Sequence, residues 1–143
     1  VSNTFFQLGT FSRRYRQARR ALELTERLHP DSPVIRYADC AFYDLLDSAA
    51  KAGSPGSYCH PALSILSRYD HDNGTDLYHT LEAYLACNCS VKTAAEKLFI
   101  HRNSLNYRLE RIQALTRTEL DSSNVRFLLT MSYRIDHFTG RDA

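Results

Sequence analysis

The sequence lacks any uninterrupted run of eighteen apolar residues, which is about the length that a membrane-spanning helix needs. It also lacks a basic segment followed by a short apolar one at its start, so no secretion signal is predicted. The 143-residue chain begins with Val1 rather than methionine, and its first residues, VSNTFFQL, are typical of the inside of a domain. We therefore expect a cytoplasmic segment of a longer protein, without a membrane partner.

Cysteine is scarce, with four residues at positions 40, 59, 87 and 89. A chain of this size with so few cysteines does not have the disulfide framework of small secreted domains. Cys87 and Cys89 are separated by one residue, whereas zinc sites usually have two or more between paired ligands. The sequence therefore predicts no metal site, and the cysteines are interpreted as reduced, half-buried small apolar side chains.

Patterns that carry catalysis are also missing. The sequence has no glycine-rich phosphate loop, no serine, histidine and acid in a hydrolase-like order, and no carboxylate pair on one face of a predicted helix. We therefore expect neither enzymatic activity nor a cofactor. Internal repeats and low-complexity stretches are absent from the sequence as well.

Positive charge is present in two concentrated segments, although the net charge is only +2. Residues 92–117 contain six lysines and arginines against two glutamates, and residues 10–29 contain six arginines against two glutamates. The rest of the chain is therefore acidic. Such segments are typical of surfaces that bind nucleic acid, but the arginines of residues 10–29 are more simply interpreted as the solvated face of a helix.

Apolar spacing predicts a mainly α-helical fold. Phe11, Tyr15, Ala18 and Leu22 recur at steps of three or four residues, which predicts an amphipathic helix of about eighteen residues that ends before Pro30. Further helices are predicted over residues 38–52, over residues 60–69, and from a cap at Thr75 or Asp76 to a break at residues 87–90. Residues 70–74 are predicted to be a polar turn, and one short strand pair is expected between residues 1–6 and 34–37.

The segment from Ser90 onward predicts two helices joined by a tight turn. Ser90 is a suitable N-cap for a helix over residues 91–98, in which Ala94 and Ala95 leave room for a second helix to cross closely. A turn over residues 99–101 places Ile100 in the core. Many such turns carry glycine with a positive φ at the position of Phe99; because phenylalanine is strained there, the turn is expected to be built differently.

The second helix is predicted to start near Arg102 and to bury one stripe of apolar residues, namely Leu105, Leu109 and Ile112. Its opposite side carries arginine, asparagine, serine and tyrosine, which are side chains that contact base edges and phosphates in DNA. The pattern therefore indicates a helix-turn-helix that binds double-stranded DNA. An ordinary helical hairpin with a solvated face is the alternative.

The segment from Leu77 to Ile112 resembles the C-terminal region of the PucR family of bacterial transcription regulators. The matching residues are Leu77, Thr80, Leu81, Tyr84 and Leu85, then Thr93, Ala94, Ala95 and Leu98, and then His101, Arg102, Asn103, Ser104, Leu105, Tyr107, Arg108 and Leu109. The resemblance implies a C-terminal Fis-like helix-turn-helix that binds DNA as a homodimer, with a closing helix near residues 124–135. It divides the chain into a remnant of a central regulatory domain with linker helices, residues 1–73, and a DNA-binding domain, residues 74–143.

Roles in DNA binding are assigned on this basis, with a recognition helix over about residues 102–115. Arg102 and Asn103 are expected at base edges, Asn103 having a helix cap as its alternative role, and Asn106 and Tyr107 lie one turn further on. The residues expected near phosphates are Lys92, Thr93, Ser104 and Arg111. His101 is a candidate contact, although a cap or turn anchor is the more ordinary role, and Arg108 is either a phosphate ligand or the partner of an acidic neighbour.

Two other functions fit the same sequence. The motif can serve as a protein-interaction or dimerisation module that no longer binds DNA, or as an architectural protein that bends DNA with little sequence preference. Exposed Arg102, Asn103 and Asn106 favour DNA, because interfaces between proteins prefer aromatic residues and Leu at such positions. The expected partners are therefore double-stranded DNA, a second copy of the chain and, in transcription, RNA polymerase.

Overall fold

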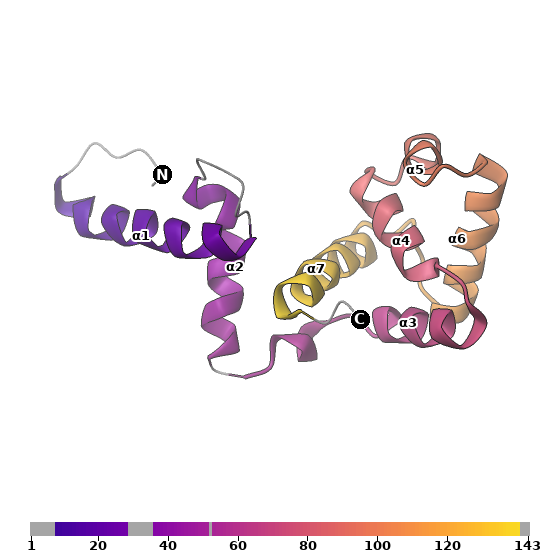
Figure 1. Cartoon of the computed structure of the whole chain (residues 1–143), viewed down its shortest axis with the longest axis horizontal. Helices are drawn as coiled ribbons and strands as arrows, with labels where there is room; N and C mark the ends of the chain where they lie inside the picture. Colours follow the sequence, from indigo (N-terminus) through magenta and orange to yellow (C-terminus); the bar gives the residue numbers. More distant parts are fainter. Residues whose placement is uncertain (1–7, 29–35, 52, 141–143) are drawn as a thin grey trace. The chain divides into compact units, whose positions relative to one another are not determined.

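The computed structural model describes residues 8–28, 36–51 and 53–140, and every regular element in these ranges is helical (Figure 1). The α-helices are α1 (Phe11–Leu28), α2 (Tyr37–Ala50), α3 (Ala62–Asn73), α4 (Leu77–Ala86), α5 (Val91–Lys97), α6 (Arg102–Thr116) and α7 (Ser123–Thr139), with short 3-10 helices at Leu8–Thr10 and Pro55–Tyr58. This confirms the predicted mainly α-helical class. Among these residues, no helix combines the length and the apolar character that crossing a bilayer requires.

The expected strand pair is not seen in the part of the chain that the structure describes. Residues 1–6 and 34–35 lie outside that part, and Tyr37 is the first residue of α2 rather than the end of a strand. Arg36 is extended, with φ −91° and ψ 142°, because it is the N-cap of α2, and its carbonyl accepts from the Asp39 amide at 2.9 Å. Arg36 and Tyr37 therefore belong to a helix start.

The chain divides into two compact units between Pro55 and Gly56. In the first unit, α1 packs on α2, and the Arg20 side chain of α1 contacts Asp44, at 2.6 Å, and Asp47 of α2. These carboxylates raise the pKa of Arg20 above its already high ordinary value. Arg13, Arg16 and Arg19 are exposed, which agrees with the interpretation of this helix as having a solvated basic face.

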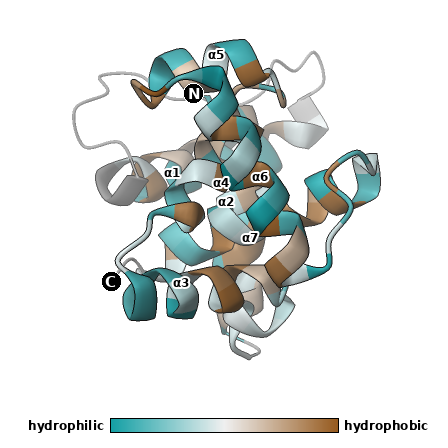
Figure 2. Ribbon diagram, turned by 90° about the vertical axis from the view of Figure 1, so that its right-hand side faces the viewer, coloured by the Kyte–Doolittle hydropathy of each residue, from teal (hydrophilic) through white to brown (hydrophobic). Residues whose placement is uncertain are grey.

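The second unit contains α3 to α7 around one hydrophobic core. Its fully buried members include Leu66 of α3, Leu81 of α4, Ala94 of α5, Leu105 of α6 and Leu129 of α7. Figure 2 shows hydrophobic and hydrophilic stretches alternating along these helices, as expected for elements with one buried face. Helix α3 therefore packs in the same core as the two helices of the helix-turn-helix. The expected division of the chain into a regulatory remnant, residues 1–73, and a DNA-binding domain, residues 74–143, stays a prediction.

Asp70, near the end of α3, caps the start of α4. The predicted turn over residues 70–74 is wrong, since α3 continues to Asn73 and ends at Gly74, whose φ is 63°. The Asp70 carboxylate accepts from the backbone amides of Leu77, at 2.9 Å, and Tyr78, at 2.7 Å. The start of α4 is thus capped from the preceding helix, whereas Asp76, at the N-cap position, makes no side-chain cap.

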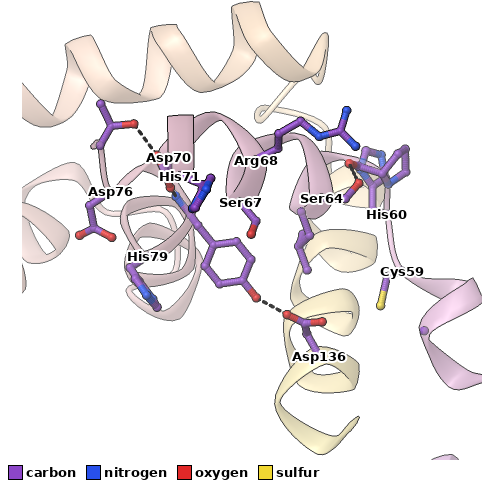
Figure 3. A pocket seen from close by; sticks show the side chains of 15 residues that line it. Cys59, His60, Ser64, Ser67, Arg68, Asp70, His71, Asp76, His79 and Asp136 are labelled. Atoms are coloured by element: carbon purple, nitrogen blue, oxygen red, sulfur yellow. Dashed lines mark hydrogen bonds between the residues drawn. The ribbon is translucent and has the colours of Figure 1, made fainter. Parts of the chain in front are cut away.

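Helix α7 is joined to α4 by two tyrosines. The Tyr78 hydroxyl donates to Asp136 at 2.6 Å, which Figure 3 shows as a dashed line, and the Tyr133 hydroxyl donates to the Tyr78 carbonyl at 2.8 Å. The two rings meet edge to face with centroids 4.9 Å apart. Burial raises the pKa of Tyr133 far above its ordinary value, so its hydroxyl stays protonated and donating. These contacts fix the closing helix α7 against α4.

Candidate nucleic-acid interface

The first helix of the motif, α5, starts as the sequence predicts. The Ser90 hydroxyl accepts from the Thr93 amide at 3.3 Å and lies 3.0 Å from the Thr93 hydroxyl. Ala94 and Ala95 are buried against the core, whereas Lys92 and Thr93 in the first turn are exposed. The small buried pair therefore lets α6 pack closely on α5, and the polar first turn faces solvent.

In the turn between α5 and α6, Phe99 adopts the strained left-handed conformation that the turn was expected to avoid. Phe99 has φ 55°, so the prediction of a differently built turn is wrong. The Phe99 amide donates to the Glu96 carbonyl at 3.2 Å, and the Ile100 amide donates to the Ala95 carbonyl at 3.1 Å. These bonds close the helix end around a left-handed residue, as glycine usually does. Ile100 packs against the core, as predicted, and the Phe99 side chain is 96% exposed.

Replacement of Phe99 by glycine is expected to stabilise the second unit by about 1 kcal/mol, because the left-handed conformation costs a residue with a Cβ about 1–2 kcal/mol. Little packing is lost, because the ring is almost fully exposed. Urea unfolding of the two chains measures the difference. Phe127→Gly on α7 is the control, because it also removes an exposed ring but places glycine inside a helix, which is destabilising. A glycine variant at position 99 that is less stable than the unaltered chain would contradict the inference that Phe99 is strained.

Helix α6 is capped by His101. Its imidazole Nδ1 accepts from the Asn103 amide at 3.2 Å. The structure thus assigns His101 the cap, which is the more ordinary of its two predicted roles. Asn103, the second residue of α6, is exposed and is not the N-cap. Its amide side chain is therefore available for an external contact.

The faces of α6 are separated as the apolar spacing predicts. Leu105, Leu109 and Ile112 are buried in the core. The exposed residues of the helix include Arg102, Asn103, Ser104, Asn106, Tyr107, Glu110 and Arg111. The exposed side therefore presents guanidinium, amide and hydroxyl groups, and the opposite side of the helix is packed in the core. This arrangement is suited to hydrogen bonding with base edges and phosphates.

Arg108 differs from its neighbours in being half buried. Its Nη1 donates to the Thr80 hydroxyl of α4 at 3.0 Å, and Thr80 is itself fully buried. Among the described residues, no acidic side chain bonds to this guanidinium, so the structural role expected for Arg108 is filled by a threonine rather than by the acidic neighbour. The bond ties α6 to α4.

Arg111 contacts Tyr69, a residue that was not among the predicted DNA contacts. Its Nη2 and Nε donate to the Tyr69 hydroxyl of α3 at 3.0 and 3.3 Å, and its guanidinium carbon lies 5.3 Å from the Tyr69 ring centroid. The hydrogen bonds to Tyr69 raise the pKa of Arg111. Tyr69 and Arg111 also line a shallow groove between the α3–α4 junction and α6, together with Gly74, Thr75, Asp76, Leu77, Asn103, Ser104, Tyr107 and Arg108. Nothing local in the sequence links two positions 42 residues apart.

Comparison with known proteins locates the same segment. Residues 77–135 match the model of the PucR C-terminal helix-turn-helix domain. The chain is 32% identical over 127 residues to the proline-responsive transcriptional activator PutR of Bacillus subtilis, which covers 88% of this chain and 31% of the relative. It is 31% identical over 136 residues to the carbohydrate diacid regulator of Escherichia coli, which covers 95% of this chain and 34% of that protein.

A third relative is the DNA-binding transcriptional activator AdeR of Bacillus subtilis, 29% identical over 88% of this chain and 30% of its own length. The chain thus spans about a third of the length of these curated relatives. No solved structure matches it. Two of these relatives are transcriptional activators by name and the third is a regulator by name, and the similarity extends upstream of the matched domain.

Proposed function

The chain belongs to the PucR family through the helix-turn-helix domain of residues 77–135, and from this premise we propose that it is the sequence-specific DNA-binding part of a transcriptional regulator. The observation that carries the proposal is the exposed row of hydrogen-bonding side chains on α6, a helix whose opposite face is buried and whose start is capped. A preorganised helix of this kind fits the major groove.

The first turns of α6 supply the proposed base contacts. Arg102 donates to guanine, Asn103 pairs with adenine, and Asn106 and Tyr107 follow one turn later on the same exposed side. The capping bond of His101 supports this arrangement, since it leaves the Asn103 side chain outside the cap. His101 itself is exposed and adjacent to Arg102, and we propose that it makes an additional contact to the DNA backbone.

Phosphate contacts are proposed for residues that flank these base-contacting side chains. Lys92 and Thr93 lie exposed at the start of α5, and Ser104 and Arg111 lie exposed on α6. Lysine, arginine and hydroxyl side chains are the usual ligands of phosphate oxygens, and their contacts fix the register of the protein on the duplex. The two groups together would hold α6 in the groove.

The active species is proposed to be a homodimer in the cytoplasm that reads two half-sites about 34 Å apart, or a multiple of this distance. One helix of this size buries too little surface for the affinity that a regulator needs. Contact with RNA polymerase is a further proposal for the whole regulator, and it is supported by the names of the relatives, two of which are called transcriptional activators.

Lys92→Ala tests the DNA-binding function directly. Because a lost phosphate contact releases one counterion fewer, the slope of log affinity against log salt is expected to flatten by about 0.9. Binding should weaken equally on a duplex selected from a random pool and on random duplex of the same length. Fluorescence anisotropy over a series of KCl concentrations measures both.

The matched control is Lys51→Ala, which removes an exposed lysine of the first unit and should leave the slope unchanged. If the unaltered chain shows no salt-dependent binding to either duplex, the motif is an interaction module instead. If it binds both duplexes equally, the architectural function is favoured.

A further inference from the structure

The contact between Arg111 and Tyr69 leaves most of the guanidinium unused. Arginine has five N–H donors, and two of its nitrogens, Nε and Nη2, donate to the single Tyr69 hydroxyl oxygen. Among the described residues, no other hydrogen bond and no ion pair to Arg111 is found. The remaining donors, including both of Nη1, are thus available on an exposed part of α6.

Tyr69 is well placed to hold this side chain still. It is half buried and packs against the hydrophobic core, and α3 is anchored in that core by Leu63 and Leu66. Its hydroxyl therefore has a fixed position beside α6. An arginine held at one edge by a fixed acceptor has fewer conformations to lose when its other edge binds a ligand.

The side chains around Arg111 favour an anionic ligand such as a backbone phosphate. Ser104, Tyr107 and Arg111 lie on the same side of α6, three and four residues apart, and all three line the groove beside the α3–α4 junction. Asp76 lines it too, as an exposed carboxylate, and it disfavours an anion close to its own end of the groove. Arg108 lines the groove as well, but it is half buried and its Nη1 donates to Thr80, so Arg111 is the more accessible phosphate donor.

We infer that Tyr69 is a positioning residue of the DNA interface, whose hydroxyl orients the Arg111 guanidinium toward a backbone phosphate of bound double-stranded DNA. The inference rests on the proposed function and extends it to α3. Tyr69 lies upstream of the matched domain of residues 77–135, so the functional DNA-binding unit begins before that domain.

The test is a double-mutant cycle in the full chain with Tyr69→Phe, Arg111→Ala and the two combined. Phenylalanine keeps the ring and its packing but removes the hydroxyl. The probes are a labelled duplex selected from a random pool and a random-sequence duplex of equal length, with affinities measured over a KCl series. Tyr58→Phe is the matched control, because Tyr58 is an exposed tyrosine of the second unit that lines neither α6 nor the groove.

Arg111→Ala is expected to flatten the salt slope by about 0.9. Tyr69→Phe should weaken binding to both duplexes by about 2- to 12-fold, the cost of ordering one flexible side chain, with an unchanged salt slope and melting temperature. In the Arg111→Ala background the same change should have no effect. Tyr58→Phe should behave like the unaltered chain.

Two results would overturn the inference while leaving DNA binding intact: unchanged affinity in Tyr69→Phe, or an equal loss with and without Arg111. A melting temperature that falls together with affinity, in both backgrounds, would assign Tyr69 a structural role only and also overturn it. Absence of salt-dependent binding by the unaltered chain would instead refute the proposed function, and the inference would fail with it.

Discussion

Replacement of Leu105 by alanine is expected to destabilise the second unit by about 2–5 kcal/mol, the usual cost of truncating a buried leucine. Leu105 has no exposed surface and lies in the core that α3, α4, α5, α6 and α7 share. The lost methyl groups leave a cavity, because helices fixed by the Tyr78 and Arg108 hydrogen bonds can close on it only in part. Urea unfolding measures the loss.

Ile65→Ala is the control for this change. Ile65 lies on α3 in the same unit but is 39% exposed, so its truncation removes less buried area and should cost clearly less. A loss at Leu105 no larger than at Ile65 would mean that α6 is not packed as described. Since α6 carries the proposed contacts, DNA affinity should fall with stability in the Leu105 variant.

Changing Arg102 or Asn103 to alanine is expected to cost about 1–3 kcal/mol of binding free energy on a selected duplex and much less on random DNA, because a bidentate base contact is lost. The ratio of the two affinities should therefore collapse. Neither residue lies in the core, and His101 rather than the Asn103 side chain caps α6, so the melting temperature should not change. Affinities on both duplexes and thermal unfolding of each variant provide the measurement.

Asn124→Ala is the matched control, because Asn124 is exposed and is the second residue of α7, as Asn103 is of α6. It should change neither affinity nor specificity. Equal losses on selected and random DNA would place Arg102 or Asn103 at the phosphates instead. A lower melting temperature for the Asn103 variant alone would contradict the assignment of the cap to His101.

Local patterns predicted the helices of the motif because each depends on residues within one or two turns. The Ser90 cap, the Ala94–Ala95 pair and the stripe of Leu105, Leu109 and Ile112 follow directly from sequence spacing, and the structure confirms them. The bounds of α1 were predictable for the same reason, since its apolar spacing ends before Pro30.

Features that depend on distant residues were not predictable in this way. Asp70 was placed in a turn because polar residues cluster there, yet its carboxylate closes the start of α4. The strain at Phe99 contradicted a correct local rule, since the hydrogen bonds to Ala95 and Glu96 outweigh the conformational cost. Tyr69 was missed because its partner on α6 is 42 residues away and only packing brings them together.

The position of α7 in the core affects how the chain folds during its synthesis. Leu129 and Tyr133 fill the core beside α3 and α4, and Tyr133 bonds to a carbonyl 55 residues earlier. Because a ribosome releases about 5–20 residues per second, α3 to α6 emerge seconds before the helix that covers their apolar side. A nascent chain stalled before residue 123 should therefore bind chaperones that recognise exposed apolar surface, and release from them should coincide with the emergence of α7.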